Sequence, residues 1–550
     1  MQPIAGSKNA MKEGQIGMPR AEERADGMSR RRLLAAIGKA AGGAAMYQAM
    51  ASLGHAAESD FSPVRLDGDP KGASVLILGA GIAGLVGAYE LARAGYKVEL
   101  LEYAERVGGR SWTLRGGDEY TELGGFRQVC EFEKGLYLNP GPWRLPYHHR
   151  GILDYCRRLG VAIEPFLEVN HNAYVHSPKA FGGKPQRLRH VLADYQGGIA
   201  ELLAKAASQD KLDDLVSKED REVLLESLRS WGALDRNFAY KAGERVSERR
   251  GYDKDPGGGL SGEWKESQPV ALADVLHSGL WRQISLGNVY EYQPSLFQPV
   301  GGMDMIPKAF EREVGHLIRR NAKVIAIRQD EQGVTAQYVD AKRGGEIRSA
   351  RADWCLCTIP LSVLSQLEID AGRPLREAIG AVPYLASTKI GLQFKRRFWE
   401  EDEAIYGGIT YTDLPIRQIA YPNTGFNRTG RGVLLGAYLF DGANSYEFTA
   451  MPPAERIERA VEFGATIHPQ YRGEFENGVA VAWHRVPFTL GCSGDWSDEA
   501  RSQHYRNLCQ IDGRIVLAGE HASALPAWQE GAILSSLDAV SRLHERVVKS

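Results

Sequence analysis

Short apolar runs alternate with a helical pattern between residues 74 and 101. The run Ser74–Leu78 is apolar after its first residue and predicts a buried parallel strand. Small and apolar residues over 85–94 predict a helix that ends before Gly95, and Lys97–Leu101 predicts a second strand. This strand–helix–strand order is typical of a parallel α/β unit.

Later parts of the chain carry further strand patterns and one long helical region. Strands are predicted at 323–327, 352–358, Thr388–Phe394, Gly432–Leu439 and 514–519, and a helix is predicted from about residue 529 to the chain end. Between 151 and 285 the patterns are helical with charged faces, as at 212–228, and a Gly- and Asp-rich loop follows at 251–262. The α/β unit is therefore expected beside a strand-rich α+β part and a helical part.

The first 63 residues differ from the rest and predict an export signal with a linker. Arg30, Arg31 and Arg32 precede an Ala- and Gly-rich apolar stretch over 33–53, which Lys39 interrupts, and small residues follow. The paired arginines resemble a twin-arginine signal, so the protein is expected in the periplasm or secreted. A disordered or amphipathic extension is the alternative, and the protein is then cytoplasmic. No segment predicts a transmembrane span.

Composition argues against a nucleic-acid-binding protein and against a disulfide-stabilised one. The chain has 550 residues, enough for several domains, and its 67 basic and 69 acidic residues give a net charge of −2. A balance of this kind argues against a nucleic-acid partner. The six cysteines contain no CxxC pair and are too few for a disulfide framework in so long a chain. Cys355 and Cys357 are expected on one buried face of a strand.

The glycines after the first strand predict a dinucleotide site. Gly79-Ala-Gly81-Ile82-Ala83-Gly84 stands between the predicted strand and the helix, where such glycines make a tight turn and admit a pyrophosphate. Glu102 ends the second strand about twenty residues further on, where an acid bonds a ribose hydroxyl. An acid there favours FAD or NAD over NADP.

Four separated blocks resemble the flavin-containing amine oxidases. They are the glycine turn with the following Arg106-Val-Gly108-Gly109-Arg110, the segment Gly301–Asp304 with the strand at 323–327, the strand at 352–358, and the C-terminal Gly519-Glu520 with 527–533. The resemblance implies an FAD cofactor and a Rossmann-like FAD-binding domain interleaved with a mixed-sheet substrate domain and a helical domain. It implies cofactor contacts at Gly79, Gly81, Ile82, Ala83, Gly84, Glu102, Arg110, Gly141, Pro142, Trp143, Arg144, Val324, Gly519, Glu520, Ala527, Trp528 and Ala532, and no metal.

The same resemblance divides the chain into domains. The FAD-binding domain is expected from three pieces, at 64–150, 290–370 and 491–550. The helical part of the substrate side is expected at 151–289, and the substrate-binding domain at 371–490. The chain then crosses between the domains several times.

The segment at 136–146 resembles the L-amino-acid oxidase branch of that family. There an arginine after Gly-Pro-x, here Arg144, binds the substrate α-carboxylate, and its planar fork suits a bidentate contact. The resemblance places the hydroxyl of Tyr438 on the same carboxylate, Lys389 beside a water near flavin N5, and Trp528 against the flavin. Arg127 is the other candidate and is set aside, because it lies in an apparent insertion. Each residue also has a structural alternative. Arg144 could form a salt bridge, Tyr438 and Trp528 could be core aromatics, and Lys389 could be an ordinary strand lysine.

The implied activity is oxidation of an L-amino acid by dioxygen. Its products are a 2-oxo acid, ammonia and hydrogen peroxide. Two alternatives share these motifs, an amino-acid 2-monooxygenase that forms an amide and an amine oxidase that does not bind a carboxylate. A flavin-binding protein without turnover is a third. The preferred side chain stays open, as does the oligomeric state, for which a homodimer is one option.

Cys492 raises the question of a covalent flavin. Trp483 precedes it at the spacing that the monoamine oxidase branch uses for its flavin-linked cysteine, but Thr489-Leu490-Gly491 replaces the small residues before that cysteine. The sequence therefore favours non-covalent FAD.

Overall fold

A computed structural model describes residue 61 and residues 64–209, 217–440 and 442–549. The predicted export signal therefore lies outside the described residues, apart from Phe61. By its contacts the chain divides into two units, 1–57 and 58–550, and the second unit contains all of the described residues.

A five-stranded parallel sheet carries the glycine turn. Its order is β12 (Ile318–Arg319), β2 (Lys97–Leu101), β1 (Ser74–Leu78), β16 (Trp354–Cys357) and β23 (Ile515–Leu517). These strands come from the three separate ranges predicted for the FAD-binding domain. The domain boundaries themselves stay a prediction.

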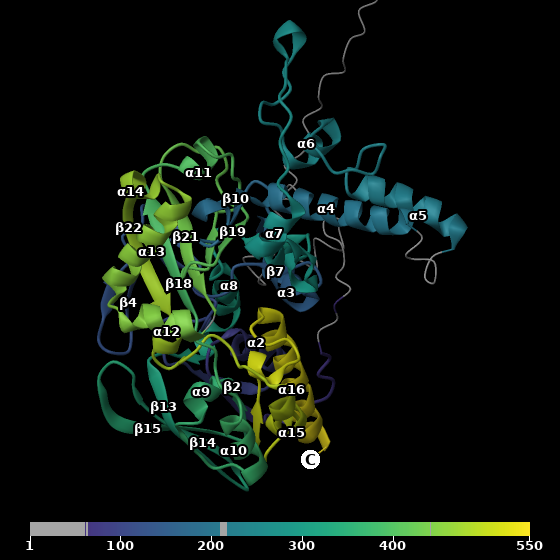
Figure 1. Ribbon diagram of the computed structural model, residues 1–550. Helices are drawn as coiled ribbons and strands as arrows, with labels where there is room; N and C mark the ends of the chain where they lie inside the picture. Colours follow the sequence, from purple (N-terminus) through teal and green to yellow (C-terminus); the bar gives the residue numbers. More distant parts are fainter. Residues whose placement is uncertain (1–60, 62–63, 210–216, 441, 550) are drawn as a thin grey trace, which may run out of the picture. The chain divides into compact units, whose positions relative to one another are not determined.

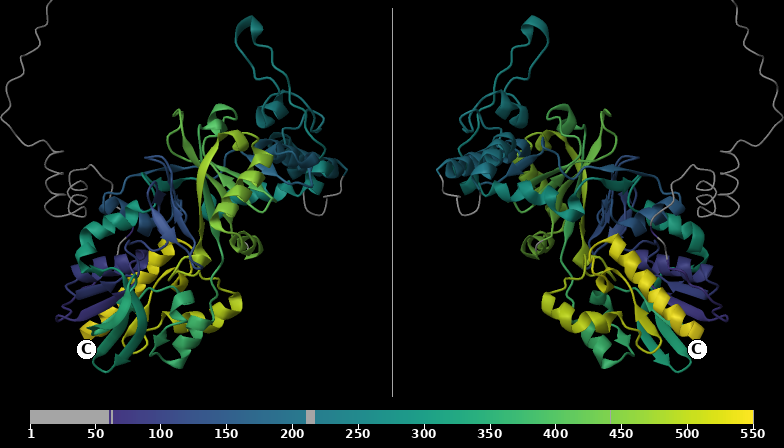
Figure 2. Two further views of the ribbon diagram at one scale, coloured as in Figure 1. Left: turned by 90° about the vertical axis from the view of Figure 1, so that its left-hand side faces the viewer. Right: turned by 90° about the vertical axis from the view of Figure 1, so that its right-hand side faces the viewer.

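Side chains alternate between two cores on the faces of this sheet. Val75 and Ile77 pack against α2 (Ile82–Arg93), α3 (Arg150–Arg158), α8 (Met305–Val314) and α16 (Gln529–Lys549). Leu76 and Leu78 belong to the opposite core, with Cys355 and Cys357. Burial on both faces explains the continuous apolar runs of the strands. Figures 1 and 2 show α16 beside α2, as their contacts require.

A second layer covers that opposite face. It contains the sheet β15 (Gly344–Ala352), β14 (Gly333–Asp340), β13 (Ala322–Asp330) and β17 (Glu368–Ile369), together with α9 (Leu361–Leu364), α10 (Arg373–Gly380) and α15 (Asp498–Cys509).

The part predicted to be the substrate side is built on a seven-stranded mixed sheet. Its order is β10 (Gln186–Arg187), β9 (Tyr174–His176), β19 (Ile409–Thr412), β20 (Gln418–Ala420), β21 (Gly432–Leu439), β18 (Thr388–Phe394) and β22 (Phe475–Ala482). One face packs on α11 (Phe398–Glu401), α12 (Gly442–Ala450), α13 (Pro453–Ile467) and α14 (Tyr471–Glu474). The other face carries Tyr438 and turns toward the site.

Helices and short sheets complete the substrate side. The helices are α4 (Leu188–Ser208), α5 (Lys218–Trp231), α6 (Glu244–Arg250) and α7 (Leu272–Ser278), followed by the 3-10 segments η3 (Leu280–Asn288) and η4 (Tyr290–Tyr292). The short sheets pair β7 (Leu145–Pro146) and β8 (Ile163–Phe166) with β11 (Leu296–Pro299), β3 (Leu114–Arg115) with β6 (Tyr137–Leu138), and β4 (Glu119–Thr121) with β5 (Arg127–Val129).

The predicted fold class is confirmed, and the element boundaries differ in places. Strands β1, β2, β18 and β21 match the predicted residues, whereas α2 begins at Ile82 rather than at residue 85, because the glycine turn already supplies its first turn. The range 151–289, predicted to be helical, also contains β8, β9 and β10. Within the described residues, no helix combines the length and the apolar character that crossing a bilayer requires.

Candidate functional site

A cavity of about 750 Å³ extends from the glycine turn after β1 to the site-facing side of the seven-stranded sheet. At one end it is lined by Gly79, Gly81 and Glu102, and at the other by Arg144, Tyr438 and Trp528. Residues from all three ranges of the predicted FAD-binding domain meet the substrate side in this single space.

Three glycines in the turn have different physical reasons to be glycine. Gly79 has a φ of +102°, and a Cβ on Gly84 would lie 1.9 Å from the carbonyl oxygen of Gly79. Protein geometry alone therefore requires these two. A Cβ on Gly81 would meet no described protein atom within 4 Å, although Gly81 lines the cavity. The bare backbone at Gly81 suits a ligand that approaches the turn closely.

Glu102 is held at the C-terminal end of β2 by backbone amides. Its two carboxylate oxygens accept hydrogen bonds from the amides of Ala80, at 2.6 Å, and Ala104, at 2.8 Å. Burial raises the pKa of Glu102, and these amides oppose that shift. The fixed carboxylate faces the cavity and could accept hydrogen bonds from ribose hydroxyls.

Glu520, which is buried, and Arg110, which is partly buried, form an ion pair in the cavity wall. Arg110 Nη1 donates to Glu520 Oε1, at 2.8 Å, and to the carbonyl oxygen of Cys492, at 2.6 Å. The amide of Ala527 donates to the other oxygen of Glu520, at 3.1 Å. Burial would raise the pKa of Glu520, but Arg110 brings it below its ordinary value, so the group is an anion at neutral pH. The Cys492 side chain lines the same part of the cavity.

Arg144 is a buried cation in the cavity wall, and it already has one anionic neighbour. Its Nη1 donates to Glu168 Oε2, at 2.8 Å, and both side chains are buried. The guanidinium carbon lies 4.3 Å from the ring centre of Tyr292. Its Nε has no hydrogen-bond acceptor among the described residues. A buried donor of this kind is costly unless a ligand pairs with it.

Tyr438 and Lys389 are direct neighbours across β21 and β18. Lys389 Nζ lies 4.3 Å from the ring centre of Tyr438 and donates to the carbonyl oxygen of Gly141, at 2.5 Å. Burial lowers the pKa of Lys389 well below its ordinary value. Tyr438 lines the cavity, whereas Lys389 lies behind its wall.

The structure brings most of the predicted site residues together. All of them line the cavity except Gly84, which acts inside the turn, and Lys389. Their roles toward a ligand stay predictions. Arg127, the candidate set aside, forms an exposed ion pair with Glu119 between β4 and β5.

Sequence reasoning missed Glu168, Tyr411 and Tyr292. Tyr411 donates to Glu168 at 3.4 Å, and Tyr292 covers Arg144. Glu168 follows β8, Tyr411 lies in β19, and Tyr292 ends η4, so the three are far apart in the chain. The one available sequence signal is that Glu168 interrupts an apolar stretch. That signal does not identify Arg144 as the partner of Glu168.

Comparison with known proteins identifies the family. The model of the flavin containing amine oxidoreductases matches residues 82–544. The chain belongs to the flavin-containing amine oxidoreductase family. Relatives of this family member include an L-amino-acid oxidase of Siganus canaliculatus, 28% identical over 86% of both chains. Another is an L-amino-acid oxidase of Bungarus fasciatus, 25% identical over 86% of both chains.

Solved structures of other oxidases share the fold. Cyclohexylamine oxidase from Brevibacterium oxydans has a TM-score of 0.55 and 16% identity, covering 87% of this chain and 99% of its own. A triple mutant of putrescine oxidase, from a redesign of its cofactor binding, has a TM-score of 0.57 at 16% identity, covering 87% and 99%.

The residues of this amine oxidoreductase fit a flavin nucleotide. Gly81 leaves room for a diphosphate beside the start of α2, where helix amides attract anions. Glu102 provides acceptors for a ribose, and Glu520 provides a second anion further along the cavity. The cavity then ends at aromatic side chains, Trp143, Tyr438 and Trp528, which could enclose a ring system.

Proposed function

We propose that the protein oxidises L-amino acids to 2-oxo acids with FAD and dioxygen, releasing ammonia and hydrogen peroxide. The observation that carries this proposal is Arg144, a buried guanidinium in the cavity wall whose Nε lacks an acceptor among the described residues. A substrate carboxylate would supply that acceptor. The L-amino-acid oxidases among the relatives support the same substrate class.

In this proposal the protein side chains act by binding and orienting the substrate. Arg144 takes the α-carboxylate with Nε and its remaining amino group, while Glu168 keeps Nη1 in place. We expect Tyr438 to donate its hydroxyl to the same carboxylate. Burial raises the pKa of Tyr438 well above its ordinary value, so the hydroxyl keeps its proton. Fixing the carboxylate orients the Cα–H bond toward the reacting position.

In this proposal the aromatic side chains around Arg144 also exclude water from the substrate. Trp143, Tyr292 and Trp528 all lie around the Arg144 guanidinium, with ring centres 4.3 to 5.8 Å from its central carbon. The amine must be neutral to react, and a dry pocket favours the neutral form. A bound flavin supplies the two-electron acceptor, which dioxygen reoxidises. Hydrolysis of the resulting imino acid yields the 2-oxo acid and ammonia.

The cofactor is proposed to be FAD held without a covalent bond. Glu102, the glycine turn and the Arg110–Glu520 pair supply its contacts. Burial raises the pKa of the Cys492 thiol, so the thiolate needed for a covalent link is disfavoured. Acid precipitation tests this point, because a non-covalent flavin stays in the yellow supernatant.

A peroxide assay on the purified protein tests the activity. The panel contains the twenty L-amino acids, their D-enantiomers and plain amines, and 2-oxo acid and amide products are measured separately. Peroxide with a matching amount of 2-oxo acid from L-amino acids supports the proposal. An amide product would indicate the monooxygenase alternative.

A second candidate is oxidation of plain amines. The ion pair between Glu168 and Arg144 favours it, because Glu168 already neutralises much of the charge that a carboxylate would meet. The structural neighbours include oxidases named for putrescine and cyclohexylamine. Peroxide from amines and none from L-amino acids would select this candidate.

We also propose that residues 1–63 direct export through the twin-arginine route. The motif at Arg30, Arg31 and Arg32 before the apolar stretch supports it. A signal for folded proteins suits an enzyme that takes up its flavin before export.

A further inference from the structure

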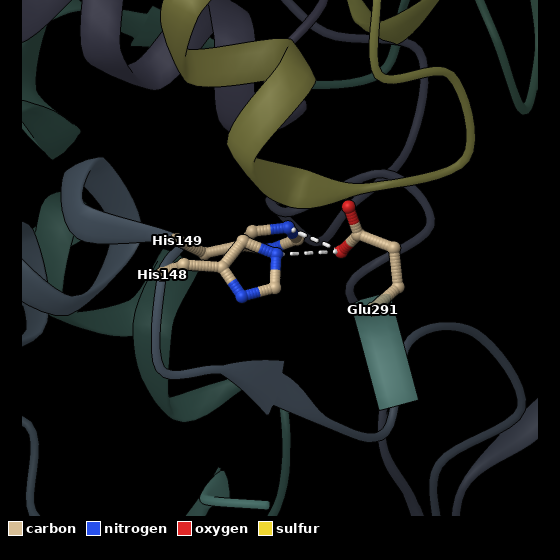
Figure 3. A group of neighbouring side chains, drawn as sticks. All are labelled: His148, His149 and Glu291. Carbon is tan, nitrogen blue, oxygen red and sulfur yellow. Dashed lines mark hydrogen bonds and ion pairs between the residues drawn. The ribbon is translucent and has the colours of Figure 1, made fainter. Parts of the chain in front are cut away.

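A cluster of two histidines and one glutamate lies beside the cavity and has no part in the proposed oxidation. His148 and His149 immediately precede α3, and Glu291 is the middle residue of η4. One ligand atom from each residue lies within 4.8 Å of the others. Figure 3 shows both imidazole rings turned toward the Glu291 carboxylate.

The convergence of two consecutive side chains is unusual. The Nε2 atoms of His148 and His149 lie 3.1 and 2.8 Å from the same oxygen, Glu291 Oε2. The two rings stand nearly perpendicular, at 83°. The backbone before α3 therefore turns both imidazoles toward η4, where Glu291 lies.

We propose that His148, His149 and Glu291 form a binding site for a divalent transition-metal ion of the zinc type. Two imidazole nitrogens and a carboxylate oxygen are a common ligand set for such ions, with water in the fourth position. Tetrahedral ligands at ~2.0–2.2 Å from zinc lie ~3.3 Å from one another. The two N–O separations are a few tenths of an ångström shorter than this, and the two nitrogens lie within 4.8 Å of each other, so binding an ion requires the Glu291 carboxylate to move outward and the imidazole rings to adjust.

The surroundings hold these ligands in place before any ion binds. Glu530, at the start of α16, accepts hydrogen bonds from the amides of Gly151, at 2.9 Å, and Ile152, at 2.8 Å, and so fixes the beginning of α3. Tyr290 stacks on His148, with ring centres 4.0 Å apart, and Trp528 packs edge-on against His149. His149 is 2% exposed. These packing contacts restrict the orientation of both imidazole rings.

An ion at this position would affect the structure of the neighbouring cavity wall. Glu291 is next to Tyr292, which covers Arg144 and lines the cavity. An ion bound by all three residues would tie η4 to the start of α3. It would therefore hold one wall of the substrate end in place without touching the substrate.

Zinc binding to the flavin-loaded protein tests this directly. Equilibrium dialysis with Zn²⁺ compares the wild type with Glu291→Gln and His148→Gln, and with His171→Gln, which changes an exposed histidine outside the cluster. We expect one Zn²⁺ per wild-type chain and per His171→Gln chain, and affinity at least ~10-fold weaker in the two cluster variants. The flavin spectrum of each variant reports whether it has folded.

Two further measurements separate this site from adventitious binding. X-ray absorption at the zinc edge should give only N and O ligands at ~2.0–2.2 Å, whereas a cysteine site would give sulfur at ~2.3 Å. Zn²⁺ should raise the unfolding temperature of the wild type but not that of Glu291→Gln. Equal binding by wild type and Glu291→Gln, or no saturable binding by the wild type, would overturn the proposal. None of these readouts depends on the substrate.

Discussion

At the scale of single residues, the proposed function assigns to Arg144 the choice between an amino acid and a plain amine. Its guanidinium is buried in the cavity wall and retains donors beyond the one that Glu168 occupies. A buried cation with donors of this kind discriminates strongly between substrates with and without a carboxylate.

Replacing Arg144 by methionine should selectively impair amino-acid oxidation. Losing a buried charge-assisted pair costs about 2–5 kcal/mol, which is a loss of ~30-fold or more in kcat/KM. Steady-state kinetics measure it, with Arg127→Met as the matched control, because that arginine is 61% exposed in a surface ion pair. A KM for amino acids within twofold of the wild type would exclude Arg144 as the carboxylate site.

Glu168→Gln should act in the opposite direction. The amide oxygen still accepts a hydrogen bond from Arg144 Nη1, while the negative charge that competes with the substrate carboxylate is gone. We expect KM for amino acids to fall about fivefold, roughly 1 kcal/mol, with kcat unchanged. If KM instead rises, as we expect for Arg144→Met, Glu168 holds Arg144 in place rather than competing with the substrate carboxylate.

At the scale of elements, the turn between β1 and α2 contains one glycine that folding requires, Gly84, and one that the proposed cofactor contact requires, Gly81. A side chain at Gly84 would collide with the backbone of Gly79, whereas one at Gly81 would enter the cavity. The same substitution at two neighbouring positions should therefore have different consequences.

Gly81→Ala should yield a folded protein that binds flavin poorly. Its unfolding free energy without flavin should stay within about 0.5 kcal/mol of the wild type, as for a substitution that touches no protein atom. Gly84→Ala should lower it by about 1–3 kcal/mol through overpacking. Denaturant unfolding of the apoproteins and flavin titration measure both. Normal flavin affinity in Gly81→Ala would contradict the placement of the diphosphate at this turn.

Elements with a strong local pattern could be predicted from the sequence. Strands β1, β2, β18 and β21 lie at their predicted residues: β1 is apolar after Ser74, β21 is buried throughout, and the glycine turn between β1 and α2 has fixed spacing. The contact of Glu168 with Arg144 could not be predicted, because it depends on how β8 packs beside the loop that carries Arg144. The same holds for Tyr292, whose place over Arg144 depends on how η4 packs beside the loop that carries Arg144.

At the scale of the whole molecule, the site exists only because the chain returns to the parallel sheet several times. Gly81, Val324 and Glu520 come from three separate ranges and line one cavity with Tyr438 from the substrate sheet. Both ends of the cavity therefore belong to one folded unit, 58–550.

The predicted export signal in the N-terminal segment gives a separate prediction about localisation. Replacing Arg30 and Arg31 by lysine should keep the protein in the cytoplasm with its flavin, because that signal requires the arginine pair. Cell fractionation followed by the peroxide assay measures it. If the protein is still exported after the replacement, the segment is not a twin-arginine signal.

The most direct test of the central claim is anaerobic mixing of the yellow protein with a matched pair of substrates. One is an L-amino acid that the peroxide assay accepts, and the other is the amine that lacks only its carboxylate. The account predicts rapid bleaching of the flavin absorbance by the amino acid and at least ~30-fold slower bleaching by the amine, at equal concentrations below saturation. It also predicts that Arg144→Met removes most of this difference. Equal bleaching by both compounds in the wild type would contradict the claim that this cavity recognises an amino-acid carboxylate.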